Sequence, residues 1–147
     1  MDNRGNIVAP FAASPVNVSD MVLFDRSFTN LLELATDLNW NLKKSFITLD
    51  TGFYSDFNRS IIRYAGMIPV IRPNPGARKN PAKLEKIWNE FSPVAHIYKE
   101  RYRIERCNAW EDTYRKMVIR YEKLQCTFMG FRYLAYSLIN FRNIFSK

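Results

Sequence analysis

The sequence predicts an α/β fold with a helical C-terminal region. Three observations support this prediction: an apolar run at residues 46–49 stops at an Asp-Thr-Gly turn, strand-like and helix-like segments alternate along the first half, and residues from 95 onward have helical apolar spacing. Such alternation is typical of a parallel sheet covered by helices. With 147 residues and 47% hydrophobic composition, the chain is expected to form one packed domain over residues 1–147.

The first forty residues predict a turn, a short strand and a helix. The Asp-Asn-Arg-Gly run at residues 2–5 has turn chemistry, and residues 6–12 have the pattern of a short strand. Ser19 and Asp20 are good helix-starting residues, because either side chain can accept hydrogen bonds from amides of the first turn. Apolar residues then recur at helical spacing through residues 21–38, which predicts a helix with one buried face.

The next segment predicts a strand, a helix and a second strand. Residues 46–49 are apolar throughout, as in a strand that is buried on both faces. Residues 57–64 have a helical pattern, Gly66 ends that helix, and residues 67–71 form the following strand. Pro69 cannot donate a backbone hydrogen bond, so this strand is expected at a sheet edge. The whole sheet would have about three strands.

The remaining chain predicts a loop followed by helices. Residues 72–81 combine prolines, a glycine and three basic residues, so we expect an exposed loop that is either a DNA contact or a solvated linker. From residue 95 the chain is expected to be helical, with a break near residues 127–130. Cys107 and Cys126 lack metal-ligand spacing and are interpreted as reduced thiols in the core.

Positive charge is concentrated in the later part of the chain. Residues 1–50 carry four Lys/Arg against six Asp/Glu, residues 51–94 seven against three, and residues 95–147 eleven against five, for a net charge of +8. Such a field concentrates polyanions such as nucleic acid, although a merely soluble basic domain has the same composition. The polar first residues and the arginine within the most apolar stretch predict no membrane insertion and a cytoplasmic location.

Asp50 begins the first of two candidate chemical motifs, Asp-Thr-Gly-Phe-Tyr-Ser at residues 50–55. A carboxylate at the carboxyl end of a parallel strand lies where open α/β sheets bind their ligands. Mg²⁺ prefers hard oxygen ligands of this kind. The alternative interpretation is that Asp50 is a turn residue before a glycine.

Glu105 belongs to the second motif, which spans residues 98–106. On a helix, Arg101 and Glu105 are four residues apart and share a face, with Tyr98 near the same stripe. A helix that carries a carboxylate beside an arginine can complete a metal site while the arginine binds a phosphate oxygen. The alternative interpretation is an ordinary surface ion pair.

Together the two motifs resemble those of the DDE-type transposases of bacterial insertion sequences. The second catalytic Asp of that family lies in a D-x-G-Y pattern similar to residues 50–55, and its catalytic Glu lies in a helical Y-x-x-R-x-x-x-E signature similar to Tyr98, Arg101 and Glu105. Residues 66–72 and the Asn-Val-Ser-Asp run at residues 17–20 are also similar to the family pattern. The resemblance covers essentially the whole chain.

The resemblance implies a truncated RNase H-like sheet and metal-dependent cleavage and joining of DNA. Asp50 and Glu105 would be catalytic ligands of Mg²⁺ or Mn²⁺, with their carboxylates within about 4–8 Å of each other. The expected partners are transposon-end DNA and a second chain, through self-association or pairing with a full-length transposase; the protein would be nucleoid-associated in a bacterial cytoplasm. The implied DNA-binding residues are Arg72, Arg78, Lys79, Tyr98, Arg101, Arg103 and Arg106.

The chain also departs from the family pattern. The family often has a Lys or Arg seven positions after its Glu, where this sequence has Asp112. The family's first strand and first catalytic Asp would precede the turn at residues 2–5, so we expect both to be missing and this chain to be inactive alone. The alternative function is a non-catalytic DNA-binding remnant, or a modulator that pairs with full-length transposase through its helices.

Overall fold

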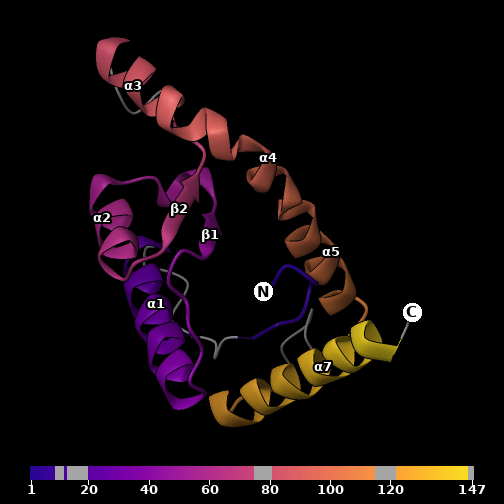
Figure 1. The fold of residues 1–147 in the computed structure, drawn as a ribbon. Coiled ribbons are helices and arrows are strands. Elements are labelled where there is room, and N and C mark those ends of the chain that lie inside the picture. Colours follow the sequence, from indigo (N-terminus) through magenta and orange to yellow (C-terminus); the bar gives the residue numbers. More distant parts are fainter. Residues whose placement is uncertain (9–11, 13–19, 75–80, 115–121, 146–147) are drawn as a thin grey trace. The chain divides into compact units, whose positions relative to one another are not determined.

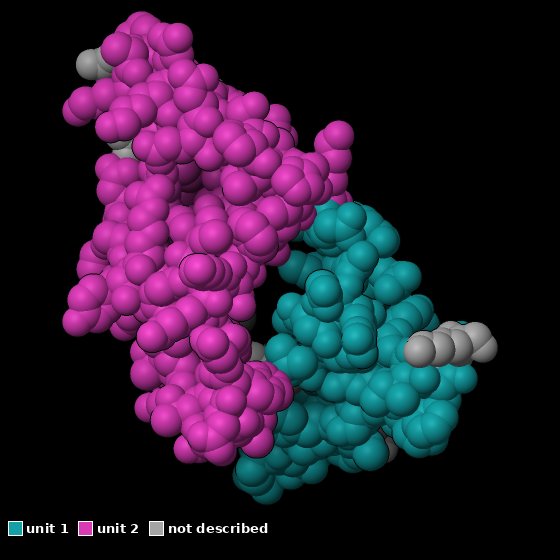
Figure 2. Space-filling view, viewed as in Figure 1, with its two compact units in different colours: residues 1–8, 100–147 teal, residues 9–99 magenta. Residues whose placement is uncertain are grey.

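The structure, a computed structural model, describes residues 1–8, 12, 20–74, 81–114 and 122–145. These residues form two compact units: residues 1–8 and 100–147 belong to unit 1, and residues 9–99 to unit 2 (Figure 2). The described part is mixed α/β and mostly helical, with one two-stranded parallel sheet (Figure 1). The mixed α/β class and the helical C-terminal region are therefore confirmed, while the RNase H-like sheet and the single domain stay predictions.

Unit 2 contains a β-α-β unit. β1 (Phe46–Leu49) and β2 (Ile68–Ile71) are parallel, and they are connected by the 3₁₀ helix η1 (Thr51–Phe53) and by α2 (Asp56–Tyr64). Ser55 caps α2, because its hydroxyl accepts a hydrogen bond from the Asn58 amide at 3.0 Å. Gly66 follows α2 with a φ of +77°, a conformation that suits glycine. The predicted strand, helix, glycine stop and strand are confirmed.

The core of unit 2 lies between this β-α-β unit and α1 (Asp20–Asp37). Phe24 and Phe28 lie one turn apart on α1 with ring centroids 5.5 Å apart, and both are buried against Ile62 of α2 and Ile71 of β2. The prediction of a helix with one buried face is thus confirmed. Burying such rings is among the largest favourable terms in a domain of this size.

The prediction that β1 is buried on both faces is wrong. Phe46 is exposed and the other three residues of β1 are half-buried, whereas Val70 and Ile71 of β2 are buried. The physical reason is that β1 pairs with β2 alone within the described residues, so its other edge has no neighbouring strand there. An apolar composition on all four positions reflects strand propensity here more than burial.

Helical structure begins earlier than predicted, at Pro81, a residue that suits the first position of a helix because its missing amide has no helical partner there. α3 (Pro81–Phe91), η3 (Ser92–Val94), α4 (Ala95–Tyr98), η4 (Lys99–Arg101) and α5 (Tyr102–Glu111) follow one another. Of the predicted loop at residues 72–81, only residues 72–74 and 81 are described, and the rest lies outside the described residues.

Unit 1 pairs α5 with α7 (Gln125–Phe145). The predicted break near residues 127–130 is wrong, because α7 runs through these residues without interruption. The described break follows α5, where residues 112 and 113 form a turn. Gly130 is tolerated inside the helix, since an isolated glycine costs only about 1 kcal/mol relative to alanine.

The N-terminal segment of unit 1 is a turn followed by an extended stretch. The predicted turn is confirmed: the Asp2 carboxylate accepts hydrogen bonds from the Arg4 and Asn6 amides, each at 2.8 Å. Burial alone would raise the pKa of the Asp2 carboxyl, but hydrogen bonds from Asn6 and Arg4 lower it below its ordinary value. Residues 6–8 of the predicted strand at 6–12 are not in a sheet, and residues 9–11 lie outside the described residues.

Both cysteines are free thiols. Cys107 is buried on α5, which confirms its place in a core, and burial raises the pKa of its thiol. The prediction that Cys126 is also a core residue is wrong, because it lies on the exposed first turn of α7. None of the helices that the structure describes is both long and apolar enough to cross a membrane.

Candidate functional site

Asp50 lies at the carboxyl end of β1 and is exposed. Its carboxylate accepts a hydrogen bond from the Thr51 amide at 2.7 Å and thereby caps η1. Leu49 is the register partner of Ile71, so Asp50 and Arg72 leave neighbouring strands at the same end of the sheet. Arg72 is also exposed. The structure thus brings these two predicted site residues to the same end of the sheet, where both strands finish.

The rest of the motif at residues 50–55 fixes the backbone that carries Asp50. The ring of Phe53 lies 6.0 Å from that of Phe24 in the core of unit 2. The buried side chain of Asn58 donates a hydrogen bond to the Phe53 carbonyl at 2.9 Å, which holds η1 against the start of α2. Asp50 is therefore an exposed carboxylate on a well-anchored connection, as a positioned ligand requires.

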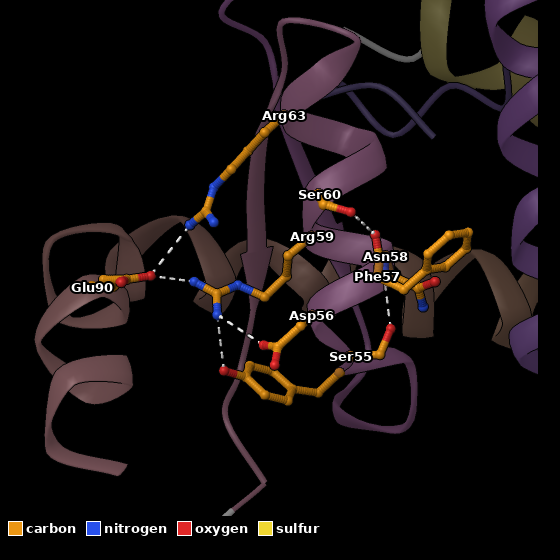
Figure 3. Close-up of polar contacts among 9 residues, drawn as sticks. Ser55, Asp56, Phe57, Asn58, Arg59, Ser60, Arg63 and Glu90 are labelled. Atoms are coloured by element: carbon orange, nitrogen blue, oxygen red, sulfur yellow. Dashed lines mark hydrogen bonds and ion pairs between the residues drawn. The ribbon is translucent and has the colours of Figure 1, made fainter. Parts of the chain in front are cut away.

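A cluster around Arg59 joins this connection to α3 (Figure 3). The Arg59 guanidinium, whose side chain is 13% exposed, pairs with Glu90 and donates to the Tyr54 hydroxyl at 3.1 Å. Arg63 donates to the same Glu90 carboxylate at 3.2 Å. Burial alone would raise the pKa of the Glu90 carboxyl, but the two arginines lower it below its ordinary value. The sequence carries no signal for this cluster, because Arg59 and Glu90 are 31 positions apart.

The second motif is helical, as predicted, but it spans three helical elements. Tyr98 ends α4 in unit 2, whereas Arg101 in η4 and Glu105 in α5 belong to unit 1. Glu105 is exposed. Tyr98 is half-buried, with its ring edge-on to Phe91 at 5.6 Å. Asp50 and Glu105 belong to different units, so the expected short distance between their carboxylates stays a prediction.

The other predicted DNA-binding residues differ in their local partners. Arg103 pairs with Glu100 at 2.6 Å, and the Arg106 guanidinium lies 5.2 Å from the centre of the Trp110 ring. Both contacts hold these arginines on unit 1 while leaving hydrogen-bond donors for a phosphate, since a guanidinium has five. Arg78 and Lys79 lie outside the described residues.

Unit 1 also holds a polar network that the sequence does not signal. The Tyr136 hydroxyl on α7 donates to the Glu111 carboxylate of α5 at 2.6 Å, and Arg132 donates to both Glu111 and Tyr136 at 2.6 and 2.8 Å. These hydrogen bonds join the three side chains, so the network links α5 to α7.

No family model, curated protein or solved structure matches the chain. Among the described residues, no three His, Cys, Asp or Glu side chains lie close enough together to hold a metal ion. Asp50 and Glu105 do have the donor chemistry that Mg²⁺ and Mn²⁺ prefer, a carboxylate open to solvent.

Proposed function

We propose that this chain is part of the DNA-cleaving core of a DDE-type insertion-sequence transposase, with Asp50 and Glu105 as two of its metal-binding acids. The observation that supports this most is the position of Asp50, exposed at the carboxyl end of a strand in a parallel β-α-β unit. Open α/β sheets bind their ligands at that end. Within the described residues only one edge of β1 pairs with a strand, and the first strand of an RNase H-like sheet would pair at the other edge.

The charged side chains at the carboxyl end of the two strands suit the binding of a phosphodiester. Asp50 would supply a metal ligand, and Arg72, directly after the neighbouring strand β2, would bind a phosphate oxygen. Glu105, on α5 and four residues after Arg101, would supply the second carboxylate. A bound Mg²⁺ or Mn²⁺ would neutralise charge on the reacting phosphate and activate the attacking water or hydroxyl.

Metal-directed cleavage tests the site without requiring DNA-cleaving activity. Ferrous iron binds the same oxygen ligands and, with ascorbate and peroxide, cuts the backbone near the ion. We expect cuts near residues 50 and 105 that Mg²⁺ suppresses and that both Asp50→Asn and Glu105→Gln remove. Asp37→Asn, which neutralises an exposed acid at the end of α1, is the matched control. Cuts that persist unchanged in Asp50→Asn and Glu105→Gln would refute the site.

The 147-residue polypeptide is expected not to nick or join transposon-end DNA with Mg²⁺. Two-metal chemistry needs enough fixed carboxylates on both sides of the phosphate, and the residues that match the family pattern here include two of its three acids. Nicking that disappears in Asp50→Ala would contradict this expectation. Asp2 would then be the first residue to test as a replacement.

A second candidate function, a modulator that pairs with another transposase chain, is favoured by one face of α7. Four apolar side chains at helical spacing lie on this face, and each is about half exposed or more: Leu134, Leu138, Phe141 and Phe145. The two charged residues of α7 lie elsewhere: Arg132 bonds Glu111, and Arg142 lies over the Trp110 ring at 5.6 Å. An uncharged stripe can pair with its own copy by two-fold symmetry, so the occupant would be a second α7.

Sedimentation of the full chain tests this pairing. We expect a dimer at micromolar concentration that Leu138→Glu converts to monomer, because the symmetric stripe would bury the new charge beside its copy. Gln125→Glu adds the same charge on the opposite side of α7 and should leave the dimer intact. A wild-type chain that sediments as a monomer at about 100 µM, far above a micromolar Kd, would rule out the pairing.

A further inference from the structure

The end of the sheet opposite to Asp50 carries an exposed aromatic ring beside two lysines. Tyr64, the last residue of α2, is 95% exposed. Lys43 and Lys44 lie in the connection between α1 and β1 and are both exposed. We call Lys43, Lys44 and Tyr64 the amino-end patch, because β1 and β2 both begin beside these residues.

Two contacts hold the lysines close to the chain that follows Tyr64. The Lys44 amide donates a hydrogen bond to the Gly66 carbonyl at 2.8 Å, and the Lys43 side chain lies 3.4 Å from where a Cβ on Gly66 would be. Lys44 has a φ of +64°, a conformation in which glycine or asparagine would be less strained. The lysine turn is thus fixed against the end of α2, two residues from the tyrosine.

The exposed ring of Tyr64 contributes almost nothing to the core of unit 2. Ile62, two residues earlier on α2, is fully buried, and burying aromatic rings is what normally stabilises a small unit. Arg63, between them, reaches away to Glu90 at 3.2 Å, as Figure 3 shows. The cations of the patch are therefore Lys43 and Lys44, and the Tyr64 ring is open to a ligand.

We propose that the amino-end patch binds a single-stranded polynucleotide, with an unpaired base stacked on Tyr64 and the adjoining phosphates bound by Lys43 and Lys44. Aromatic rings that stack bases, set beside cations that follow the backbone, are the two parts of sequence-tolerant single-strand binding. A duplex keeps its bases stacked inside, so it does not use the ring. The choice of nucleic acid rests on the proposed function, but the patch lies away from Asp50.

Fluorescence anisotropy on the full chain tests this assignment. The probes are thymidine and uridine oligonucleotides of about 15 nucleotides, within the range of such sites, and a DNA duplex of equal length. We expect Tyr64→Ala to weaken single-strand binding by at least about fivefold, the lower end of one lost base stack, and to leave duplex binding unchanged. Tyr64→Phe keeps the ring and should bind like the wild type. Tighter binding of the thymidine strand would identify the ligand as DNA, and tighter binding of the uridine strand would identify it as RNA.

Two further variants separate stacking from charge. Phe57→Ala removes another exposed ring from α2, two turns away and beside Asp56 rather than the lysines, and should change nothing. Replacing both Lys43 and Lys44 by alanine should lower the slope of log affinity against log salt by about 1.4 for single strands. Equal single-strand binding by wild type and Tyr64→Ala would overturn the proposal. Iron cuts near residue 50 that persist in Tyr64→Ala would then show that only the patch had failed.

Discussion

Tyr136 shows at the scale of one residue how a buried hydroxyl stabilises unit 1. Its side chain is buried, its hydroxyl donates to Glu111, and it accepts a hydrogen bond from Arg132. Burial first, and then the hydrogen bond to Glu111, raise the pKa of Tyr136 above its ordinary value of 10. A raised pKa in the folded state means that the protonated phenol stabilises the fold below pH 10, and that this contribution is lost as pH rises further.

Tyr136→Phe should lower the free energy of unfolding by about 1–3 kcal/mol at pH 7, because two hydrogen bonds that involve charged groups are lost. The difference between wild type and variant should shrink above pH 10, where the unfolded wild type ionises and the folded one does not. Urea unfolding at pH 7 and at pH 10.5, followed by circular dichroism, measures both. Tyr64→Phe, at a 95% exposed site, is the control. A difference that widens with pH would contradict this account.

Individual residues differ in whether their structural role could be predicted from the sequence. Asp50 was predictable as a strand-end carboxylate because an apolar run, an acid and a glycine are local signals. The Arg59–Glu90 pair and the network at Tyr136 were not, because each joins residues far apart in the sequence through the packing of helices. Tyr64 carried no such signal, because Lys44 is 20 positions away in the sequence and only the contact between Lys44 and Gly66 brings the lysines to the end of α2.

At the scale of elements, Asn140 takes the place of a neighbouring strand for the N-terminal segment. Its side-chain oxygen accepts from the Ile7 amide at 2.8 Å, and its side-chain nitrogen donates to the Ile7 carbonyl at 2.9 Å. Asn143, three residues later on α7, donates to the Gly5 carbonyl at 2.9 Å. The extended segment is therefore satisfied by a helix surface, which is why its strand-like pattern does not require a sheet there.

Asn140→Ala should release this segment from α7. Losing two hydrogen bonds is expected to cost about 1–3 kcal/mol of local stability, since each contributes about 0.5–1.5 kcal/mol. Hydrogen exchange should show the Ile7 amide exchanging at least about fivefold faster, the rate equivalent of 1 kcal/mol. Ser137→Ala, which removes a hydroxyl that donates to the Tyr133 carbonyl one turn earlier, should leave the Ile7 amide protected. Unchanged exchange at Ile7 in Asn140→Ala would contradict the docking.

Element boundaries followed from local chemistry wherever the chain supplied it. Ser55 and Gly66 bracket α2 as a serine cap and a left-handed glycine do in general. The predictions of a helix break near residues 127–130 and of a fully buried β1 are wrong because helix continuity and strand burial there depend on tertiary surroundings. α7 continues through Gly130 while it packs on α5, and within the described residues β1 is exposed because only one of its edges pairs with a strand.

At the scale of the whole molecule, charge is the property most relevant to a nucleic-acid partner. The residues of unit 1 include 11 Lys/Arg against 6 Asp/Glu, and those of unit 2 include 11 against 8, so both units are positive. Within unit 2 the sign changes along the chain, since residues 9–50 carry three basic against five acidic residues and residues 51–99 carry eight against three. DNA bound through phosphates should therefore contact the chain after Asp50 more than the chain before it.

Duplex binding should fall steeply with salt, because neutralising phosphates releases counterions in proportion to the number of contacts. Replacing Arg72 and Arg78 by alanine should lower the slope of log affinity against log salt by up to about 1.8, or about 0.9 for each lost contact. Arg26→Ala removes the same kind of charge from an exposed position on α1, in the acidic part of the chain, and should leave the slope unchanged. Titrations from about 50 to 200 mM salt measure all three chains. Affinity that stays flat over this range, or a slope that Arg26→Ala lowers equally, would refute an electrostatic interface after Asp50.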